Sequence, residues 1–504
     1  MKMKIGWSRR DVSSTEPVNL PGQYHARISM GILDPITISV LVIEDDKDAV
    51  IFISGDFVSA ENILDEIREK IAAKNGKVPT DKVIYSTTHT HCSPAYEKED
   101  YQTNVPHDGI EVYPSYKYRE FLTDSISDAV VEAYENRTEG SIAYGYGYAV
   151  TSHSRRTTYF DDLSLRPDKG GSNLFEPNGH AKMYGNTNDD MFAGYEGGTD
   201  PFVNLMYTFD IKGTLTGAII NVPCPSQNSE GEHMQTASFW NEVRNALRKK
   251  YGDIGILPQC AAAGDLAPRI LHYKAAENRR FALKYGTEPL EPRALAQREI
   301  YIRHDICERI CDAFHEVLAW AKKDMITDAP IEHTVKTILL EEYPITKEEY
   351  EYSKTQVERI VQEGYKNTGN INLDFHDNTI SAKARSAFGI IVERYEMQQQ
   401  SAKTKMELHV VRIGDVAFAT NPFELYIDFQ HRIQARSPFT QTFIVQLAAQ
   451  PDGYAKPFYL ATERAVANRG YSAIMTSCQV SAEGGQTLVE ETVKELKDLY
   501  EKES

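Results

Sequence analysis

Two histidines separated by one residue are the strongest sign of chemistry in this sequence of 504 residues. His89 and His91 lie in YSTTHTHCSPAY, residues 85–96, at the end of an apolar run that predicts a strand. Side chains two residues apart in a strand point the same way, so both imidazoles could meet one metal ion or one substrate. Zinc in particular binds neutral imidazole together with carboxylate. The pair alone is equally consistent with two ordinary polar residues at a strand exit.

Two acidic residues further along the chain could complete such a site. Asp265 lies in QCAAAGDLAPR, residues 259–269, where small residues would let the backbone approach a ligand closely. The alternative is a tight strand-to-helix connection in which Asp265 caps the helix. Glu424 lies in TNPFELY, residues 420–426, and is predicted in the first turn of a helix. There it would interact with the helix dipole, or act as a metal ligand or a general base.

Weaker candidates lie at another strand end and in a long loop. Asp56 ends the predicted strand IFISGD. Its side chain would either point into the predicted active-site pocket or stabilise a turn. His180, Asn186 and Asp190 belong to a stretch of residues 155–200 that is rich in Gly and Asn and has little periodicity. Long loops of this kind are often functional, so these side chains could bind a polar substrate, or they could be plain loop residues.

Strands and helices alternate along the chain and must position these candidates. The alternation predicts an α/β fold of mixed β-sheets that pack together and are flanked by helices. Strands are predicted at 36–56 (a pair), 82–89, 202–224, 255–261, near 331–342, within 406–422 and at 442–449; helices are predicted at 60–76, 118–137, 238–252, 293–323, about 346–364, 423–436 and after 486.

Composition and charge narrow the classes of partner. The formal net charge is -18. Nucleic acids and anionic membranes bind clustered Lys and Arg, so this charge argues against either as the main partner. The six cysteines are scattered and do not resemble a disulfide framework. No apolar run is long enough to span a bilayer, and no secretory signal follows the first residues. We therefore expect a cytoplasmic protein with a polar small-molecule substrate; a homo-oligomer is left open.

Several of these motifs, in this order, resemble the catalytic domain of the neutral/alkaline non-lysosomal ceramidases and their bacterial relatives. The similar segments are STTHTHCSPAY, DPFVNLMYTFD followed by GAIINVPC, ASFWNEVRNALRKKYGDIGILPQCAAAGDLAPR, NPFELYIDFQHRIQARSPFTQTFIVQLA and YLATERA. The resemblance runs patchily over about residues 5–490 and is poor at about 270–400 and 157–200. It implies one catalytic unit over residues 1–504, without the C-terminal immunoglobulin-like domain of the secreted ceramidases.

The resemblance also implies roles for individual residues. In that family two histidines, a glutamate and a tyrosine hold zinc. His89, Glu424 and Tyr459 match three of these ligands, with Tyr454 as a rival for the tyrosine. The other matches are His91 for the histidine that contacts the reacting group, Tyr471 for a second active-site tyrosine, and Arg155, with Arg156 close behind, for the arginine that faces the substrate.

The sequence departs from the family at two positions. The segment NVPCPSQ, which should carry the second zinc histidine, contains none, so Cys224 or a more distant His233 would have to replace it. Ala267 in GDLAP stands where the family has its nucleophilic serine. The family's serine-based mechanism therefore cannot be carried over intact.

The leading prediction is a metal-assisted hydrolase of an amide, ester or related bond in a polar, possibly sugar-containing, small molecule. Zinc would activate a water molecule, and His91, Arg155 and Tyr471 would stabilise developing negative charge. The alternative is a metal-independent glycoside hydrolase that draws its carboxylates from Asp56, Asp265 or Glu424. A third possibility is a binding protein that has lost its chemistry.

Overall fold

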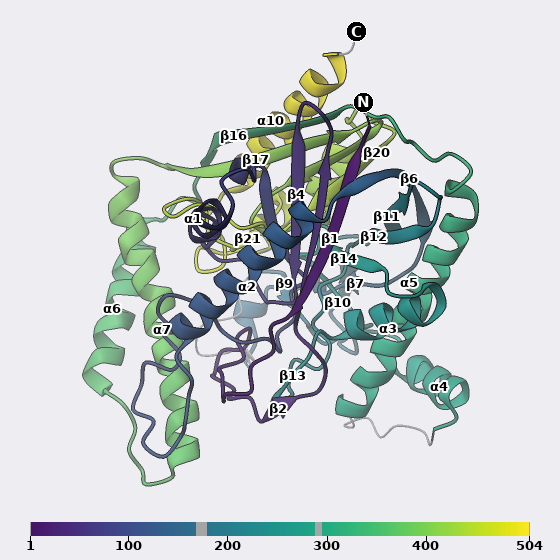
Figure 1. The fold of residues 1–504 in the computed structure, drawn as a ribbon. Helices are drawn as coiled ribbons and strands as arrows, with labels where there is room; N and C mark the ends of the chain where they lie inside the picture. The colour runs from purple at the N-terminus through teal and green to yellow at the C-terminus, as the bar shows by residue number, and fades with distance from the viewer. Residues whose placement is uncertain (1, 168–178, 288–294, 503–504) are drawn as a thin grey trace.

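A large mixed sheet forms the centre of the molecule (Figure 1). We describe it from a computed structural model that covers residues 2–167, 179–287 and 295–502. Its central strands are runs of Val and Ile because both faces of the sheet are covered. The strand order is β14-β12-β11-β6-β1-β3-β4-β5, with bounds β1 Lys4–Asp11, β3 Thr37–Glu44, β4 Ala49–Gly55, β5 Val83–Thr87, β6 Thr138–Tyr148, β11 Phe202–Asp210, β12 Leu215–Val222 and β14 Gly255–Cys260.

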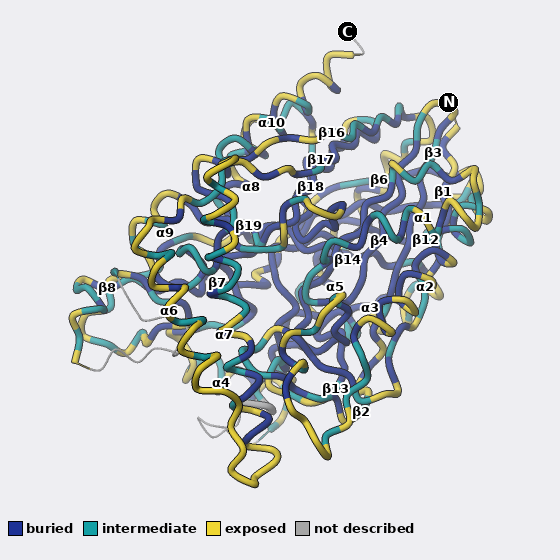
Figure 2. Tube along the Cα trace, turned by 90° about the vertical axis from the view of Figure 1, so that its left-hand side faces the viewer, coloured by how far each residue is buried: buried dark blue, intermediate teal, exposed yellow. Residues whose placement is uncertain are grey.

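A second sheet of four strands packs on one face of the first. Phe52 of β4 meets Phe418 of the second sheet with ring centroids 4.8 Å apart, and Ile219 of β12 belongs to the same buried cluster. Figure 2 shows most of the strand backbone as buried. The four strands, in spatial order, are β16 (Ile331–Glu341), β17 (Lys403–Ile413), β18 (Val416–Thr420) and β20 (Gln441–Val445).

Helices cover the outer faces of both sheets. On the eight-stranded sheet, α1 and α2 pack over β3 and β4, and α3 and α5 pack over the other half. On the four-stranded sheet, α8 and α10 take the same role. This arrangement confirms the predicted fold class. The covering helices are α1 (Leu64–Lys74), α2 (Ser115–Glu135), α3 (Phe239–Tyr251), α5 (Leu295–Ala321), α8 (Ile427–Gln434) and α10 (Ala482–Glu501).

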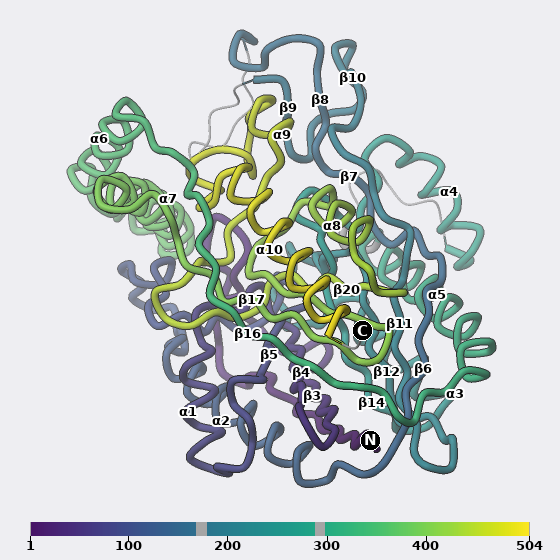
Figure 3. The backbone as a smooth tube through the Cα atoms, turned by 90° about the horizontal axis from the view of Figure 1, so that it is seen from above, coloured from purple at the N-terminus to yellow at the C-terminus, as the bar shows by residue number. Residues whose placement is uncertain are grey.

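Two further helices, α6 (Lys347–Glu363) and α7 (Ile371–Gln398), lie side by side at one side of the molecule (Figure 3). Helix α6 was predicted from the sequence, but the 28-residue α7 was not. Its buried side chains include Asn378 and Arg394, so apolar periodicity does not mark its inner face. The remaining helices are α4 (Lys274–Tyr285), α9 (Glu463–Asn468) and the short 3₁₀ helices η1 (Thr80–Lys82) and η2 (Leu163–Leu165).

Short strands position the candidate site, and here the structure differs from two expectations. Part of the predicted loop at 155–200 folds as a three-stranded sheet, β10-β8-β9. Glu424 lies in strand β19 rather than in a helix, and α8 begins at Ile427. The short strands are β2 (Gly31–Ile32), β7 (His153–Ser154), β8 (Arg156–Tyr159), β9 (Ala181–Met183), β10 (Phe192–Tyr195), β13 (Met234–Gln235), β15 (Leu266–Ala267), β19 (Glu424–Leu425) and β21 (Tyr459–Leu460).

Two chain-wide expectations concern membranes and thiols. Among the described residues, none of the helices combines the length and the apolar character that crossing a bilayer requires. All six cysteines are buried and carry free thiols, which agrees with the predicted lack of a disulfide framework.

Candidate functional site

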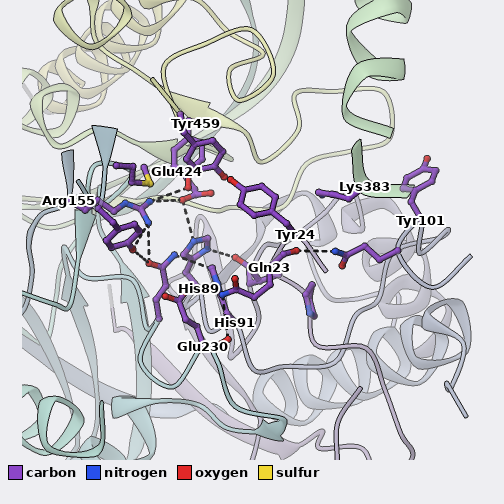
Figure 4. A pocket seen from close by; sticks show the side chains of 18 of the residues that line it. Gln23, Tyr24, His89, His91, Tyr101, Arg155, Glu230, Lys383, Glu424 and Tyr459 are labelled. Carbon is purple, nitrogen blue, oxygen red and sulfur yellow. Dashed lines mark hydrogen bonds and ion pairs between the residues drawn. The ribbon is translucent and has the colours of Figure 1, made fainter. Parts of the chain in front are cut away.

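A cavity of about 530 Å³ lies where the end of β5 faces β19 and β21 (Figure 4). Its walls come from distant parts of the chain, including residues 21–24, residues 97–102, β9 and α7. The lining is polar and aromatic. Among its described residues there is no Ser, Thr or Cys, so the cavity offers no hydroxyl nucleophile other than tyrosine. The aromatic lining residues are Tyr24, Tyr101, Tyr184, Tyr459 and Tyr471.

The two histidines enter this cavity just beyond the end of β5. His89 takes a left-handed backbone conformation with φ of 67°, which is uncommon for a residue other than glycine. Its Nδ1 lies 2.5 Å from the carbonyl oxygen of Val58, so this nitrogen donates. The imidazole rings of His89 and His91 are 5.1 Å apart and nearly perpendicular. Both line the cavity, but the turn at His89 sends them to different partners.

Glu424 meets His89 across the cavity, although 335 positions separate them in the sequence. The Oε2 of Glu424 lies 3.3 Å from Nε2 of His89 and accepts a hydrogen bond of 3.2 Å from Arg155. Burial would raise the pKa of Glu424, but its interactions with the adjacent His89 and Arg155 outweigh it and lower the pKa to about 2. Glu424 is therefore a carboxylate at neutral pH.

Tyr459 is placed beside Glu424 by strand pairing. Strands β19 and β21 run parallel in a register that sets Glu424 opposite Tyr459. Arg155 donates to the Tyr459 hydroxyl over 3.2 Å, and the ring of Tyr471 packs edge-on against Tyr459 at 5.5 Å. The structure thus brings together the tyrosines, the arginine, the glutamate and His89 that the resemblance had picked out. Tyr454 does not belong to this group, because its hydroxyl contacts Thr337 outside the cavity.

His91 belongs to a charged network that the sequence did not predict. Its Nδ1 lies 3.1 Å from Oε2 of Glu230, and its Nε2 lies 3.0 Å from the side-chain amide of Gln227. Arg269 pairs with Glu230 and also donates to Glu299 of α5 over 2.7 Å. Burial would raise the pKa of Glu230, but His91 and Arg269 hold it well below its usual range. Glu230 is therefore a fixed carboxylate behind His91.

Three residues predicted to contact substrate or catalyse do not line the cavity. Asp56 is fully buried in an ion pair of 2.7 Å with Arg244 of α3. Arg156 is fully buried against Glu196 and donates to the backbone carbonyl of Tyr471 over 2.7 Å. Asp265 accepts a hydrogen bond of 2.9 Å from the backbone N–H of Ile427, so it caps α8. Each of them supports a wall of the site instead.

The loop candidates also lie away from the cavity. His180 is exposed, and its backbone N–H donates to the carbonyl of Asn468. Asn186 is exposed, and its side chain bonds within its own turn. Lys182 and Tyr184, which lie between them, do line the cavity. The predicted loop therefore reaches the cavity, but through Lys182 of β9 and Tyr184 just after β9 rather than through the predicted residues.

Three of the predicted zinc ligands, His89, Glu424 and Tyr459, line the cavity, but neither candidate for the fourth ligand does. The Cys224 thiol lies outside the cavity lining and donates to the carbonyl of Thr151 over 3.1 Å, and burial raises its pKa well above the usual value. His233 faces the carbonyl of Ile28 and lies outside the cavity lining. Arg155 already places a positive charge on the Glu424 oxygen nearest His89. Within the described residues, no cluster of three or more His, Cys, Asp or Glu could hold a metal ion.

Ala267, at the position of the family's serine, lies in β15 and is fully buried. Its strand pairs with β7, where Ala267 sits opposite His153. The methyl group neither lines the cavity nor supplies a proton. The cavity therefore lacks this serine hydroxyl.

Comparisons with known proteins identify the fold. A crystal structure of neutral ceramidase from Pseudomonas aeruginosa is similar over the whole of this chain and 75% of that chain, with a TM-score of 0.66 and 16% identity. A structure titled ceramidase complexed with C2 is similar over 100% of this chain and 76% of that one, with a TM-score of 0.65 and 16% identity. No protein-family model and no curated protein sequence matches. The chain therefore has a ceramidase-like fold with a strongly divergent sequence.

Proposed function

We propose that this chain, which has the fold of the neutral ceramidases, is a hydrolase that cleaves an amide, ester or related bond in a polar small molecule. The observation that carries the proposal is the convergence of His89, His91, Arg155, Glu424 and Tyr459 in one cavity. Buried titratable groups that share a polar cavity are the usual mark of an active site.

Water is the nucleophile in this proposal, because the described lining provides no serine, threonine or cysteine. His91 is suited to accept a proton from that water at Nε2, which the Gln227 amide now faces at 3.0 Å, and to pass it on to the leaving nitrogen or oxygen as the acyl bond breaks. Burial keeps its pKa below the ordinary value, so its imidazole is neutral at neutral pH, and Glu230 orients the ring. Arg155 and the Tyr459 hydroxyl offer donors to the oxygen that becomes negative in the transition state. No step requires the predicted zinc ion.

The proposal is tested by assaying the purified protein against small N-acyl and O-acyl compounds, with and without chelator and added zinc. We expect hydrolysis that chelator leaves intact and that Arg155→Met reduces by about 10²-fold to 10³-fold, the usual cost of removing an oxyanion donor. Arg166→Met is the matched control, because Arg166 bonds Asp161 and Asp189 outside the cavity. Binding without turnover of any compound would instead support the non-catalytic alternative.

A glycoside hydrolase is the second candidate, and one observation favours it. Glu97 also lines the cavity, and burial together with the negative charges of Glu61 and Asp100 raises its pKa to about 8. Glu424, with a pKa of about 2, is ionised in the same cavity. A protonated and an ionised carboxyl group are the pair that glycoside cleavage requires. Cleavage of aryl glycosides that Glu97→Gln abolishes, without cleavage of acyl compounds, would establish this candidate instead.

A further inference from the structure

Residues 97–102 form an acidic side of the polar cavity, which we name the acidic wall. Its one lysine, Lys98, is outside the cavity lining and pairs with Asp452 over 2.8 Å. Figure 4 shows Tyr101 of this wall and Arg155 at opposite sides of the cavity. One end of a substrate can therefore meet the acidic wall while another part lies near Arg155. The carboxyl groups of the wall that line the cavity belong to Glu97, Glu99 and Asp100.

Hydrogen bonds to the N-terminal loop hold the acidic wall in place. Asp100 accepts a hydrogen bond of 2.9 Å from the side-chain amide of Asn19. Gln102 donates from its side chain to the carbonyl of Gln23 over 3.0 Å, and its backbone N–H donates to the carboxyl group of Asp100 over 3.1 Å. The wall is therefore fixed by the fold, and Asp100 already has protein partners.

Glu97 is the residue of the acidic wall that lacks a partner. Its Oε2 is buried, and within the described part of the chain this oxygen has no hydrogen-bond partner. Burial raises the pKa of Glu97 to about 8, and the negative charges of Glu61 and Asp100 add to this rise. Lys383 opposes the rise, but no ion pair joins it to Glu97 in the described structure. Because a buried carboxyl group without a cation is costly to ionise, the wall suits a positive charge that a ligand brings.

We propose that the acidic wall binds a protonated amine of the substrate while the scissile bond lies between His91 and Arg155. This inference rests on the proposed function and adds a substrate class: an acyl compound that also bears an ammonium group, such as a monoacylated diamine. The ammonium donates to Glu97, and Tyr24 and Tyr101 line the same cavity with aromatic rings, whose faces attract a cation. Within the described residues no cluster could hold a metal ion, so the expected cation is organic.

The test compares the N-acetyl derivatives of diaminobutane, aminobutanol and aminobutyric acid, which end in an ammonium, a hydroxyl and a carboxylate. Binding is measured by calorimetry and cleavage by released acetate. We expect the ammonium compound to exceed the hydroxyl compound by about tenfold to a hundredfold in affinity and kcat/KM, as a charged hydrogen bond gives. Because Glu97 is largely protonated at neutral pH, binding of the ammonium compound should also release about one proton, measured in buffers of different ionisation enthalpy.

Two substitutions should move this preference in opposite directions. Glu97→Gln keeps the size of the side chain and removes its charge, so the ratio of ammonium to hydroxyl values should fall by at least about tenfold and the proton release should vanish. Lys383→Met removes a competing positive charge from the cavity lining and should raise the ratio. The matched control is Glu111→Gln, which makes the same charge change at an exposed position outside the cavity and should leave the ratio unchanged.

Preferential binding of the ammonium compound without cleavage would support the acidic wall and count against the proposed hydrolase. Equal cleavage of all three compounds would leave the hydrolase standing and overturn the amine proposal. The amine proposal is also overturned by an unchanged ratio in Glu97→Gln, by a preference for the carboxylate compound, or by no binding of the ammonium compound. Calcium binding that Glu97→Gln removes would overturn it as well, because the wall would then hold a metal ion.

Discussion

The ends of β5 and β12 contact each other, but the residues after β5 line the cavity whereas the cysteine after β12 is buried away from it. The side chain and backbone N–H of Ser226, just after β12, both donate to the carbonyl of Thr88, just after β5, over 2.6 and 3.0 Å. Beyond β5, His89 and His91 turn into the cavity. Beyond β12, Cys224 is fully buried among backbone carbonyls.

This difference separates the predicted site residues that line the cavity from those that do not. The β5 end still meets the β19–β21 pair, where Glu424 and Tyr459 sit in register. Beyond β12 and β14, the Cys224 thiol and Ala267 are fully buried, at the two positions where the sequence resemblance had implied a metal ligand and a nucleophile. The chemistry we propose therefore depends on His91, Arg155 and water instead of zinc and serine.

The largest expected change in kcat/KM comes from replacing a residue at the β5 end. His91→Ala removes the proposed proton acceptor and should lower kcat/KM by about 10²-fold to 10⁴-fold, the usual contribution of a general base. His233→Ala is the matched control, since His233 lies outside the cavity and should change kcat/KM by less than about twofold. Steady-state kinetics on one cleaved acyl compound decide it; equal losses in both variants would contradict the assignment of His91.

A smaller effect is expected from the network behind His91. Glu299→Gln removes one of the two carboxylates that pair with Arg269, the other being Glu230. We therefore expect kcat to fall by roughly tenfold, about 1.4 kcal/mol of transition-state stabilisation. Glu277→Gln is the control. Glu277 of α4 pairs with Arg298 of α5, the helix that also carries Glu299, but Glu277 does not reach the cavity. If both variants lose stability alike and neither changes kcat, Glu299 has only a structural role.

A pH test asks whether the β14 end is structural. Burial raises the pKa of Asp265 to about 7, against about 3.9 for an unfolded Asp. Between those values the folded state holds a proton that the unfolded state has lost, so the free energy of unfolding contributed by Asp265 falls as pH rises from about 4 through 7. Asp265→Asn keeps the cap on Ile427 and should flatten this dependence.

Urea unfolding at several pH values measures the difference between wild type and Asp265→Asn. Asp253→Asn is the comparison variant, because Asp253 is exposed and Arg9 lowers its pKa, which keeps its titration below this range. An identical slope of stability against pH in wild type and Asp265→Asn would show that the Asp265 carboxyl ionises normally.

The sequence predicted more of the fold than of the site, for a physical reason. Runs of Val and Ile reveal strands such as β3 and β4, because burial on both faces is visible locally. The meeting of His89 with Glu424 followed from the order of motifs in the resemblance. Local patterns carry no such information about partners, so the pairing of Asp56 with Arg244, 188 positions away, was missed.

The network behind His91 was missed for a related reason. Glu230 lies in a loop without periodicity, and its partner Arg269 is 39 positions away. Helix α7 was overlooked because buried polar residues interrupt its apolar stripe. Charged pairs in loops and polar helix faces can be recognised only when the tertiary contacts are known. Here both contribute to the wall of the cavity.

The smallest expected effect sharpens the contrast at the β12 end. Cys224→Ala removes a buried thiol that packs and does not ligate, so we expect a loss of about 1 kcal/mol in stability and a change in kcat/KM of less than about twofold. Zinc per chain, measured by atomic emission, should stay well below one equivalent in wild type, Cys224→Ala and His89→Ala alike. One zinc ion per chain in the wild type that is lost in either variant would instead support the metal centre predicted from the sequence. Metal content depends on these side chains only if they hold the ion.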